Sequence, residues 1–138
     1  MTVRTLRRAL DTRGHGEVLD ITGEVRSAVK DSDLHDGTAT VFVTGSTAGV
    51  TTIEFEPGLV SDLTAAFERL YPRDTEYRHH ERWGDDNGHS HVRASMLGPS
   101  LAVPFVDGEL TLGQWQQIVI VDFDTRPRTR EYVIQLLG

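Results

Sequence analysis

Histidine is concentrated in one short part of the chain. Four of the six histidines stand between Tyr77 and Gly98, at positions 79, 80, 89 and 91, among carboxylates and an asparagine. Histidine titrates near neutral pH and is the commonest metal ligand in proteins. The cluster therefore predicts a site for metal, anion or proton chemistry. The pair Gly98-Pro99 follows it, so we expect these side chains where a loop runs into a short helix.

His79, His89 and His91 can hold one divalent metal ion, zinc or magnesium, only if the last two point the same way. Residues two apart share a side on an extended segment, but on a helix of about 3.6 residues per turn they diverge by roughly 200°. A helix that begins at Gly88 separates the two imidazoles, whereas a helix that begins at His91 lets both aim at one point. We expect the three histidines to share one ligand. The alternative is that one or two of them only hydrogen-bond the loop backbone.

Two further segments carry groups suited to binding anions. The Gly45–Gly49 loop offers exposed N–H groups together with the hydroxyls of Ser46 and Thr47, a combination that can cradle phosphate or carboxylate oxygens. It lacks the lysine of a P-loop, and a plain turn is an equally strong prediction. Near the C-terminus, arginines recur at every second position, which on a strand places them on one face as a row for an anion. They are Arg126, Arg128 and Arg130.

Carboxylates and amides mark two more candidate positions. Glu54 and Glu56 flank Phe55, so on a strand both carboxylates project to one face, where they can do acid–base work or bind metal. Two solvated glutamates at the end of a strand are the commoner alternative. Trp115 stands among glutamines. We expect the tryptophan in the core, and a neighbouring amide such as that of Gln116 in position to orient a polar substrate.

Composition narrows the class of protein. The chain has 138 residues, 38% of them hydrophobic and 25% charged, which is typical of one globular domain with its own core. It contains no cysteine, so disulfide and thiolate chemistry are excluded. A net charge of −7 disfavours nucleic-acid binding, which relies on neutralising phosphates. No apolar run approaches the roughly 20 residues that span a bilayer, so we expect a cytoplasmic protein with no membrane partner.

Hydrophobic patterning indicates the elements that must position these groups. Strands are expected at Thr2–Leu10, Glu17–Ile21, Thr38–Thr44, Val50–Phe55, Ser100–Phe105, Glu109–Leu112, Gln114–Phe123 and Thr129–Leu137, the last two as antiparallel neighbours. Helices are expected from Gly23 to Ser32, with Thr22 as N-cap, and from Pro57 to Leu70, whose apolar stripe should face the core. The prediction is a single compact α+β domain, residues 1–138, with an antiparallel or mixed β-sheet and two to three helices.

Four stretches of the chain, read in order, resemble the YjbQ-like family, also called the secondary thiamine-phosphate synthase family. They are GSTAGVTTIEFEPG, YRHHERWGDDNGHSHVRASMLGPSLAVPF, GELTLGQWQQIVIVDFD and RPRTREYVIQLLG. The resemblance covers nearly the whole chain and is strongest from Val41 onward. Its specific features are a Ser-Thr-Ala loop between strands, a Tyr-x-His, an asparagine loop before a histidine-led helix, a Leu-Gly-x-Trp-Gln string and a terminal Pro-Arg-x-Arg strand.

The resemblance implies a compact α+β subunit that assembles as a homotrimer with sites near subunit interfaces. Apolar strands at Val103–Val106 and Ile118–Phe123, which we expect at sheet edges, also favour self-association. The implied activity is a weak thiamine-phosphate synthase reaction, which joins a thiazole phosphate to a pyrimidine pyrophosphate and releases pyrophosphate. The family's site positions fall on Glu54, His79, Asn87, His91, Trp115, Gln116, Arg128 and Arg130.

One departure from the family bears directly on the site. Many members carry a histidine where this chain has Gly45, and we expect His89 to replace it from the other side. The leading hypothesis is an enzyme for a phosphorylated small molecule, in which histidines bind metal or exchange protons, Glu54 orients a histidine, and hydroxyls and arginines hold phosphate. The alternative is a non-catalytic trimer that binds a metal or an anion, which would show no turnover.

Overall fold

The computed structural model describes residues 1–138 and contains eight strands and four helices. The strands are β1 (Val3–Thr12), β2 (Glu17–Asp20), β3 (Gly37–Val43), β4 (Ala48–Ile53), β5 (Ser100–Val106), β6 (Glu109–Leu110), β7 (Gln117–Asp122) and β8 (Arg128–Leu137). The helices are α1 (Thr22–Asp31), α2 (Pro57–Leu70), α3 (Arg78–Trp83) and α4 (Gly88–Leu97).

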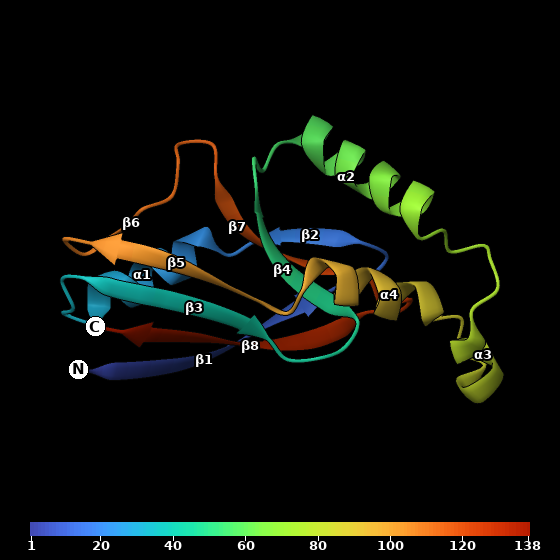
Figure 1. Ribbon diagram of the computed structural model, residues 1–138, viewed down its shortest axis with the longest axis horizontal. Helices are drawn as coiled ribbons and strands as arrows, with labels where there is room; N and C mark the ends of the chain where they lie inside the picture. The colour runs from blue at the N-terminus through green and yellow to red at the C-terminus, as the bar shows by residue number, and fades with distance from the viewer.

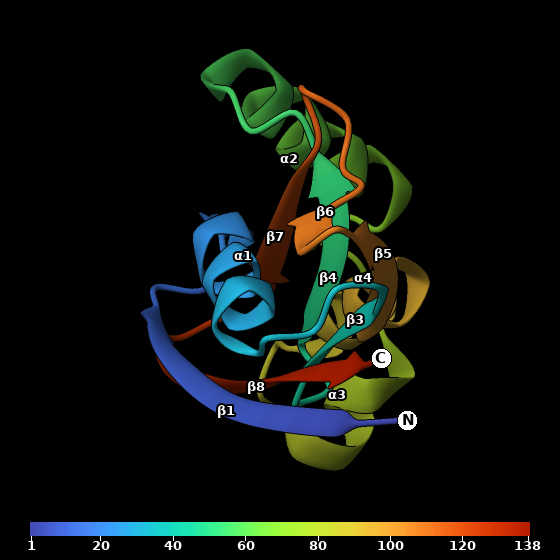
Figure 2. The same ribbon diagram turned by 90° about the vertical axis from the view of Figure 1, so that its left-hand side faces the viewer.

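The strands form two antiparallel sheets (Figure 1). The large sheet has the order β1-β8-β3-β5-β6 and the small sheet the order β2-β7-β4. The main core is a cluster of 16 buried residues drawn from both sheets and from α1, which lies between them (Figure 2). The predicted α+β class is confirmed, with four helices where two to three were expected.

Two predictions about the strands are wrong. β7 and β8 are not neighbours, because the chain crosses from the small sheet to the large one between them. The strands Val103–Val106 and Ile118–Phe123 are not edges either: β5 lies between β3 and β6, and β7 is the centre of the small sheet. The apolar character of β7 therefore reflects burial within the chain, and in β5 Val103 and Phe105 are buried while Val106 is 52% exposed.

The two predicted helices form, each with a difference. α1 begins at Thr22 with Ile21 in the N-cap position, so the predicted Thr22 cap is wrong; the Asp20 carboxylate accepts the Thr22 N–H at 2.9 Å. α2 has no fully buried residue. Phe67 packs edge-on against Phe123 at 4.8 Å in a second, smaller core, while Leu70 is 68% exposed. The stripe of α2 is thus only partly a core surface. No helix of the structure is long and apolar enough to cross a bilayer.

Candidate functional site

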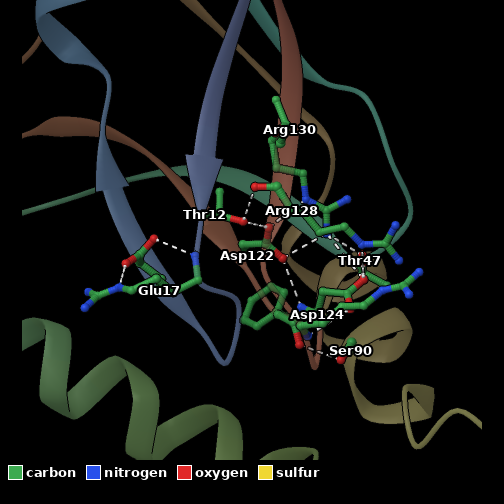
Figure 3. Close-up of polar contacts among 12 residues, drawn as sticks. Thr12, Glu17, Thr47, Ser90, Asp122, Asp124, Arg128 and Arg130 are labelled. Atoms are coloured by element: carbon green, nitrogen blue, oxygen red, sulfur yellow. Dashed lines mark hydrogen bonds and ion pairs between the residues drawn. The ribbon is translucent and has the colours of Figure 1, made fainter.

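Most of the predicted site residues lie at one end of the small sheet. There β4 begins and β7 ends, with Ala48 opposite Asp122 in the register. The loop 44–47, the first turn of α4 and the start of β8 meet at this end (Figure 3). The predicted residues found here are Ser46, Thr47, His79, Asn87, His91, Arg128 and Arg130.

Two buried aspartates, which the sequence patterns did not single out, hold this end together. Asp122 accepts two hydrogen bonds from Arg130, at 2.7 Å from Nε and 2.8 Å from Nη2, and a third from the Thr12 hydroxyl. Asp124 accepts the Thr47 hydroxyl at 2.9 Å and Nε of Arg128 at 3.1 Å. Both carboxylates are fully buried. Buried charges are tolerated when they are paired and hydrogen-bonded in this way.

Asp124 remains ionised despite its burial. Burial by itself would raise the pKa of this carboxyl, but hydrogen bonds from Thr47 and Asn87 and the charge of Arg128 bring its pKa below the ordinary value. The result is a fixed negative charge beneath the site. Asn87 occupies the N-cap position of α4 without capping it, because its side chain turns to Asp124 instead.

Arg130 belongs to this network rather than to an open surface. It is 6% exposed, and Nη2 also donates to the Thr47 hydroxyl. Nη1 lies beneath Gly45, where an added Cβ would stand 2.7 Å from it. Gly45 also has a φ of +132°, so glycine permits both the backbone conformation and the close approach. Hydrogen bonds within the chain thus use Nε and Nη2 of Arg130 and the Thr47 hydroxyl. The prediction that these atoms hold an anion is therefore wrong.

Ser46 and Arg128 remain available to a ligand. Arg128 gives only Nε to Asp124, and its side chain is 37% exposed, so its two terminal N–H groups can reach solvent or an anion. Ser46 is exposed on the loop. The predicted arginine row is thus divided: Arg130 is buried, Arg128 is half-buried, and Arg126 is exposed.

His79 and His91 lie against each other. Their ring centroids are 4.4 Å apart, and Nδ1 of His79 stands 3.4 Å from Asp85 without the alignment of a hydrogen bond. α3 ends at Gly84 in a left-handed conformation (φ 62°), which turns the chain back so that α3 faces α4. Burial, and then the charge that His79 carries when protonated, lower the pKa of His91. His91 is therefore neutral at pH 7 and can accept a proton.

His91 also lines a hollow of about 220 Å³ between the loop and α4. The remaining lining residues are Gly45, Ser46, Ala48, Ala94, Ser95 and Pro99. The hollow thus combines an imidazole, the Ser46 hydroxyl and the backbone of a glycine-containing loop, while the Ser95 hydroxyl donates to the His91 carbonyl at 2.7 Å. The imidazole, the Ser46 hydroxyl and the backbone N–H groups can donate hydrogen bonds to an oxyanion. Arg128 is connected to this loop through Asp124, which accepts hydrogen bonds from both Arg128 and Thr47.

His89 points away from this hollow, so the predicted three-histidine ligand set is wrong. α4 begins at Gly88, the arrangement that separates His89 from His91. The His89 ring is 3% exposed and lies beside Tyr77, with ring centroids 6.4 Å apart. Burial, and then the charges of Arg93 and Arg73, lower its pKa to about 4. His89 does not replace a histidine at Gly45, and no group of three His, Asp or Glu side chains is placed to hold a metal.

Three buried polar atoms in the chain have no hydrogen-bond partner, and all three belong to predicted site residues. They are Nδ1 of His79, Oδ1 of Asn87 and Nδ1 of His89. A buried polar atom without a partner costs roughly 1–3 kcal/mol, so each one requires an explanation. All three lie in α3, in α4 or in the connection between them. This segment is therefore where buried polar groups are available to bind a ligand.

Glu54, Gln116 and Trp115 lie at the opposite end of the small sheet. Ile53 pairs with Gln117 there, five residues along β4 from Ala48, which is about 17 Å at the usual rise of a strand. The Gln116 amide bonds the Thr52 hydroxyl at 3.0 Å and the Gly113 N–H at 3.1 Å. Trp115 is 66% exposed, so its predicted place in the core is wrong. Within one chain, Glu54 and Gln116 cannot touch a ligand at His91.

Comparisons with known proteins agree on one family. Residues 7–138 match the family model described as "UPF0047 protein YjbQ-like". A UPF0047 protein of Archaeoglobus fulgidus is 34% identical over 99% of this chain and 98% of its own length. A UPF0047 protein of Mycobacterium tuberculosis is 41% identical over 78% of this chain and 81% of its own. The crystal structure of a YbjQ-like protein of unknown function from Sulfolobus solfataricus superposes with a TM-score of 0.89 at 28% identity, over 99% of both chains.

Proposed function

The chain belongs to the YjbQ-like UPF0047 family, and from this premise we propose that it is a small-molecule enzyme of the secondary thiamine-phosphate synthase type. In that reaction the ring nitrogen of a thiazole phosphate attacks the methylene carbon of a pyrimidine pyrophosphate. A C–N bond forms, the C–O bond to pyrophosphate breaks, and pyrophosphate leaves with the bonding electrons. No electron donor or acceptor is required.

The observation that carries the proposal is the placement of unpartnered polar atoms beside a hollow lined by His91. Nδ1 of His79 and Oδ1 of Asn87 are buried without partners, and the His79 ring contacts the His91 ring. A network of buried charges holds the adjoining loop rigid through Asp124 and Thr47. Prepositioned polar groups of this kind stabilise charge that develops in a transition state, because they need not reorganise when it forms.

Each available group has a part in the proposed chemistry. The leaving pyrophosphate is the species that gains negative charge, so the terminal N–H groups of Arg128 and the hydroxyl and N–H of Ser46 would bind its oxygens. Neutral His91 would donate a hydrogen bond from its ring N–H to a pyrophosphate oxygen, with the His79 imidazole packed beside it. Arg130 and Asp124 act by holding the loop.

A resident zinc ion does not fit these residues. The expected ligand set loses His89, and the remaining pair of imidazoles has no third His, Asp or Glu side chain placed to complete a metal site. Structural and catalytic zinc sites require at least three protein ligands. The proposal therefore contains no step that uses a metal held by the protein.

The alternative is a protein that binds a phosphate-bearing molecule without turning it over. The hollow beside His91 is about 220 Å³. Sites for drug-sized ligands are usually about 300–1,000 Å³, so this hollow suits one anion the size of pyrophosphate better than two substrates side by side. That mismatch favours the binding role for one isolated chain.

Turnover decides between the two roles. The purified protein would be mixed with the thiazole phosphate and the pyrimidine pyrophosphate, and released pyrophosphate measured over time. The proposal predicts more product than protein, and a loss of roughly 10²–10³-fold in rate for His91→Ala, because that is the usual contribution of one positioned hydrogen-bond donor to developing negative charge. His35→Ala is the matched control, since His35 is exposed on a turn. Release of no pyrophosphate beyond one equivalent would exclude the enzyme and leave the binding protein.

A further inference from the structure

His80 lies where α3 meets the start of α4, and Figure 1 shows these two elements side by side at the edge of the molecule. Nε2 of its imidazole accepts the N–H of Gly88 at 3.3 Å. Gly88 is the first residue of α4 and is buried, so this N–H is shielded from water. A buried backbone N–H needs a partner, because leaving it unpaired costs about as much as a lost hydrogen bond. The His80 side chain therefore caps α4 from outside the helix.

The residue in the N-cap position of α4 is engaged elsewhere. The Asn87 side chain makes no capping bond, because it turns to Asp124. The first N–H groups of an α-helix have no partner within the helix, and the N-cap side chain usually supplies one. As a result, one side chain joins the start of α4 to the buried carboxylate beneath the site, and another, that of His80, joins it to α3.

Gly88 also allows α3 to approach α4 closely. A Cβ added at this position would stand 2.5 Å from Cβ of Tyr77 and 3.2 Å from Nε2 of His80. Tyr77 is itself fixed, since its hydroxyl donates to the Pro72 carbonyl at 2.6 Å. Its ring meets the His80 ring edge-on, with centroids 5.7 Å apart. The docking of α3 on α4 thus combines this close packing with the bond from Gly88 to His80.

α3 depends on these contacts for its position. It has only six residues, and isolated helices shorter than about 12–15 residues are marginal in water. None of its residues is fully buried, and its end carries the exposed Glu81, Arg82 and Trp83. It also carries His79, whose ring centroid lies 4.4 Å from that of His91 on α4. Whatever holds α3 on α4 therefore also sets the contact between these two imidazoles.

We propose that His80 is a positioning residue: its neutral imidazole holds α3 on the start of α4 and thereby places His79 against His91. Successive residues of a helix point about 100° apart, so neighbouring histidines of α3 reach α4 at two different places. One of them meets His91, and the other meets Gly88. The inference rests on the proposed function only for its consequence in turnover.

The proposal fixes the tautomer of His80. Nε2 must present a lone pair to the Gly88 N–H, so the ring proton lies on Nδ1. The competing partner is Asp86, whose Oδ1 is 3.8 Å from the same nitrogen. A bond to this carboxylate would require a proton on Nε2 instead. The two partners therefore demand opposite states of one atom.

NMR of the imidazole nitrogens in the native protein, with each ring assigned through its own backbone, measures this state. At mildly alkaline pH we expect His80 to carry a proton on Nδ1 and none on Nε2. A proton on Nε2, as pairing with Asp86 requires, would overturn the proposal. The measurement needs no substitution, so it does not depend on the folding of any variant.

Three variants test the positioning itself. His80→Ala removes the acceptor, and His80→Gln offers an amide oxygen in its place. Glu81→Ala is the matched control, because Glu81 is the next residue of α3 and is exposed. In His80→Ala we expect the Gly88 amide to exchange its hydrogen roughly 2- to 10-fold faster, the factor that corresponds to one ordinary hydrogen bond. The ring-proton signals of His79 and His91 should also move as the two rings separate, whereas His80→Gln and Glu81→Ala should keep them near their native positions.

Turnover links His80 to the proposed reaction. His80→Ala should release pyrophosphate at least about twofold more slowly than His80→Gln, because only the second variant keeps an acceptor for Gly88. If no protein turns over, the native one included, the proposed function fails, and the NMR results still decide the role of His80. Unchanged His79 and His91 signals in His80→Ala, or equal changes in His80→Ala and His80→Gln, would overturn that role.

Discussion

Replacing Arg130 with alanine separates a structural role for this residue from a ligand-binding one. Its guanidinium donates two hydrogen bonds to the fully buried Asp122, and it is itself 6% exposed. Arg130→Ala would leave that carboxylate buried with the Thr12 hydroxyl as its remaining side-chain partner. Removing one member of a buried ion pair costs about 3–5 kcal/mol, because the other charge stays desolvated. For a chain of this size we expect the melting temperature to fall by roughly 10–20 °C.

Thermal and urea unfolding followed by circular dichroism measure this effect. Arg128→Ala is the control: it lies two residues away on the same strand, it is 37% exposed and it makes one bond to Asp124. Its loss should cost less than that of Arg130, because Asp124 keeps the Thr47 hydroxyl and Nη2 of Arg130 at 3.7 Å. Arg130→Met combined with Asp122→Asn should recover part of the stability, since no unpaired charge is then buried. The reasoning is refuted if Arg130→Ala unfolds like the native protein while its pyrophosphate affinity falls tenfold or more, as the sequence alone predicts.

Three further predictions concern single residues. His89 is buried and neutral with a pKa of about 4, whereas an unfolded histidine titrates near 6.5, so the unfolded chain binds the proton first as the pH falls. Stability to urea should therefore fall by up to roughly 1.4 kcal/mol per pH unit from about pH 6.5 to 4. The variant His89→Leu should flatten this dependence. Gly45→Ala should lose roughly 1–3 kcal/mol of unfolding free energy, because φ is +132° and the new Cβ would approach Arg130; unchanged stability would contradict this. Gln116→Ala should leave the calorimetric affinity for pyrophosphate unchanged, since its amide bonds Thr52 and Gly113 at the far end of the sheet.

Local sequence patterns were sufficient to predict most helices and strands. They failed to predict which strands pair, because pairing depends on residues far away in the chain. The strand at β3 and the helix at α2 follow from β-branched runs and from apolar residues at helical spacing, and both form. That β7 and β8 enter different sheets is a property of the pairing partners β4 and β3, which no local pattern in the Gln114–Leu137 segment reveals.

The start of α4 shows the same limit within the site. Whether His89 and His91 converge depends on where the helix begins. The residues that fix this are held by the segment that follows β7: the Ser90 hydroxyl donates to the Phe123 carbonyl at 2.5 Å, and the Asn87 side chain bonds Asp124. In the sequence, Asp122 and Asp124 are two acidic residues at the end of an apolar strand, with nothing that marks them as part of a site. Their importance arises from arginines on a strand of the other sheet. The available signal in the sequence was that two aspartates at alternate positions are followed by arginines at alternate positions, which indicates that the two rows can pair.

Calorimetric titration of pyrophosphate tests the central claim most directly, because the hollow beside His91 is proposed to hold this anion. The titration would be made with the native protein, His91→Ala and the control His35→Ala. We predict saturable binding at one site per chain for the native protein and the control, and at least a tenfold loss of affinity for His91→Ala, the change expected when one charge-assisted contact worth about 1.5–3 kcal/mol is removed. Equal affinity in all three proteins, or no binding to any of them, would contradict the assignment of this hollow as the functional site.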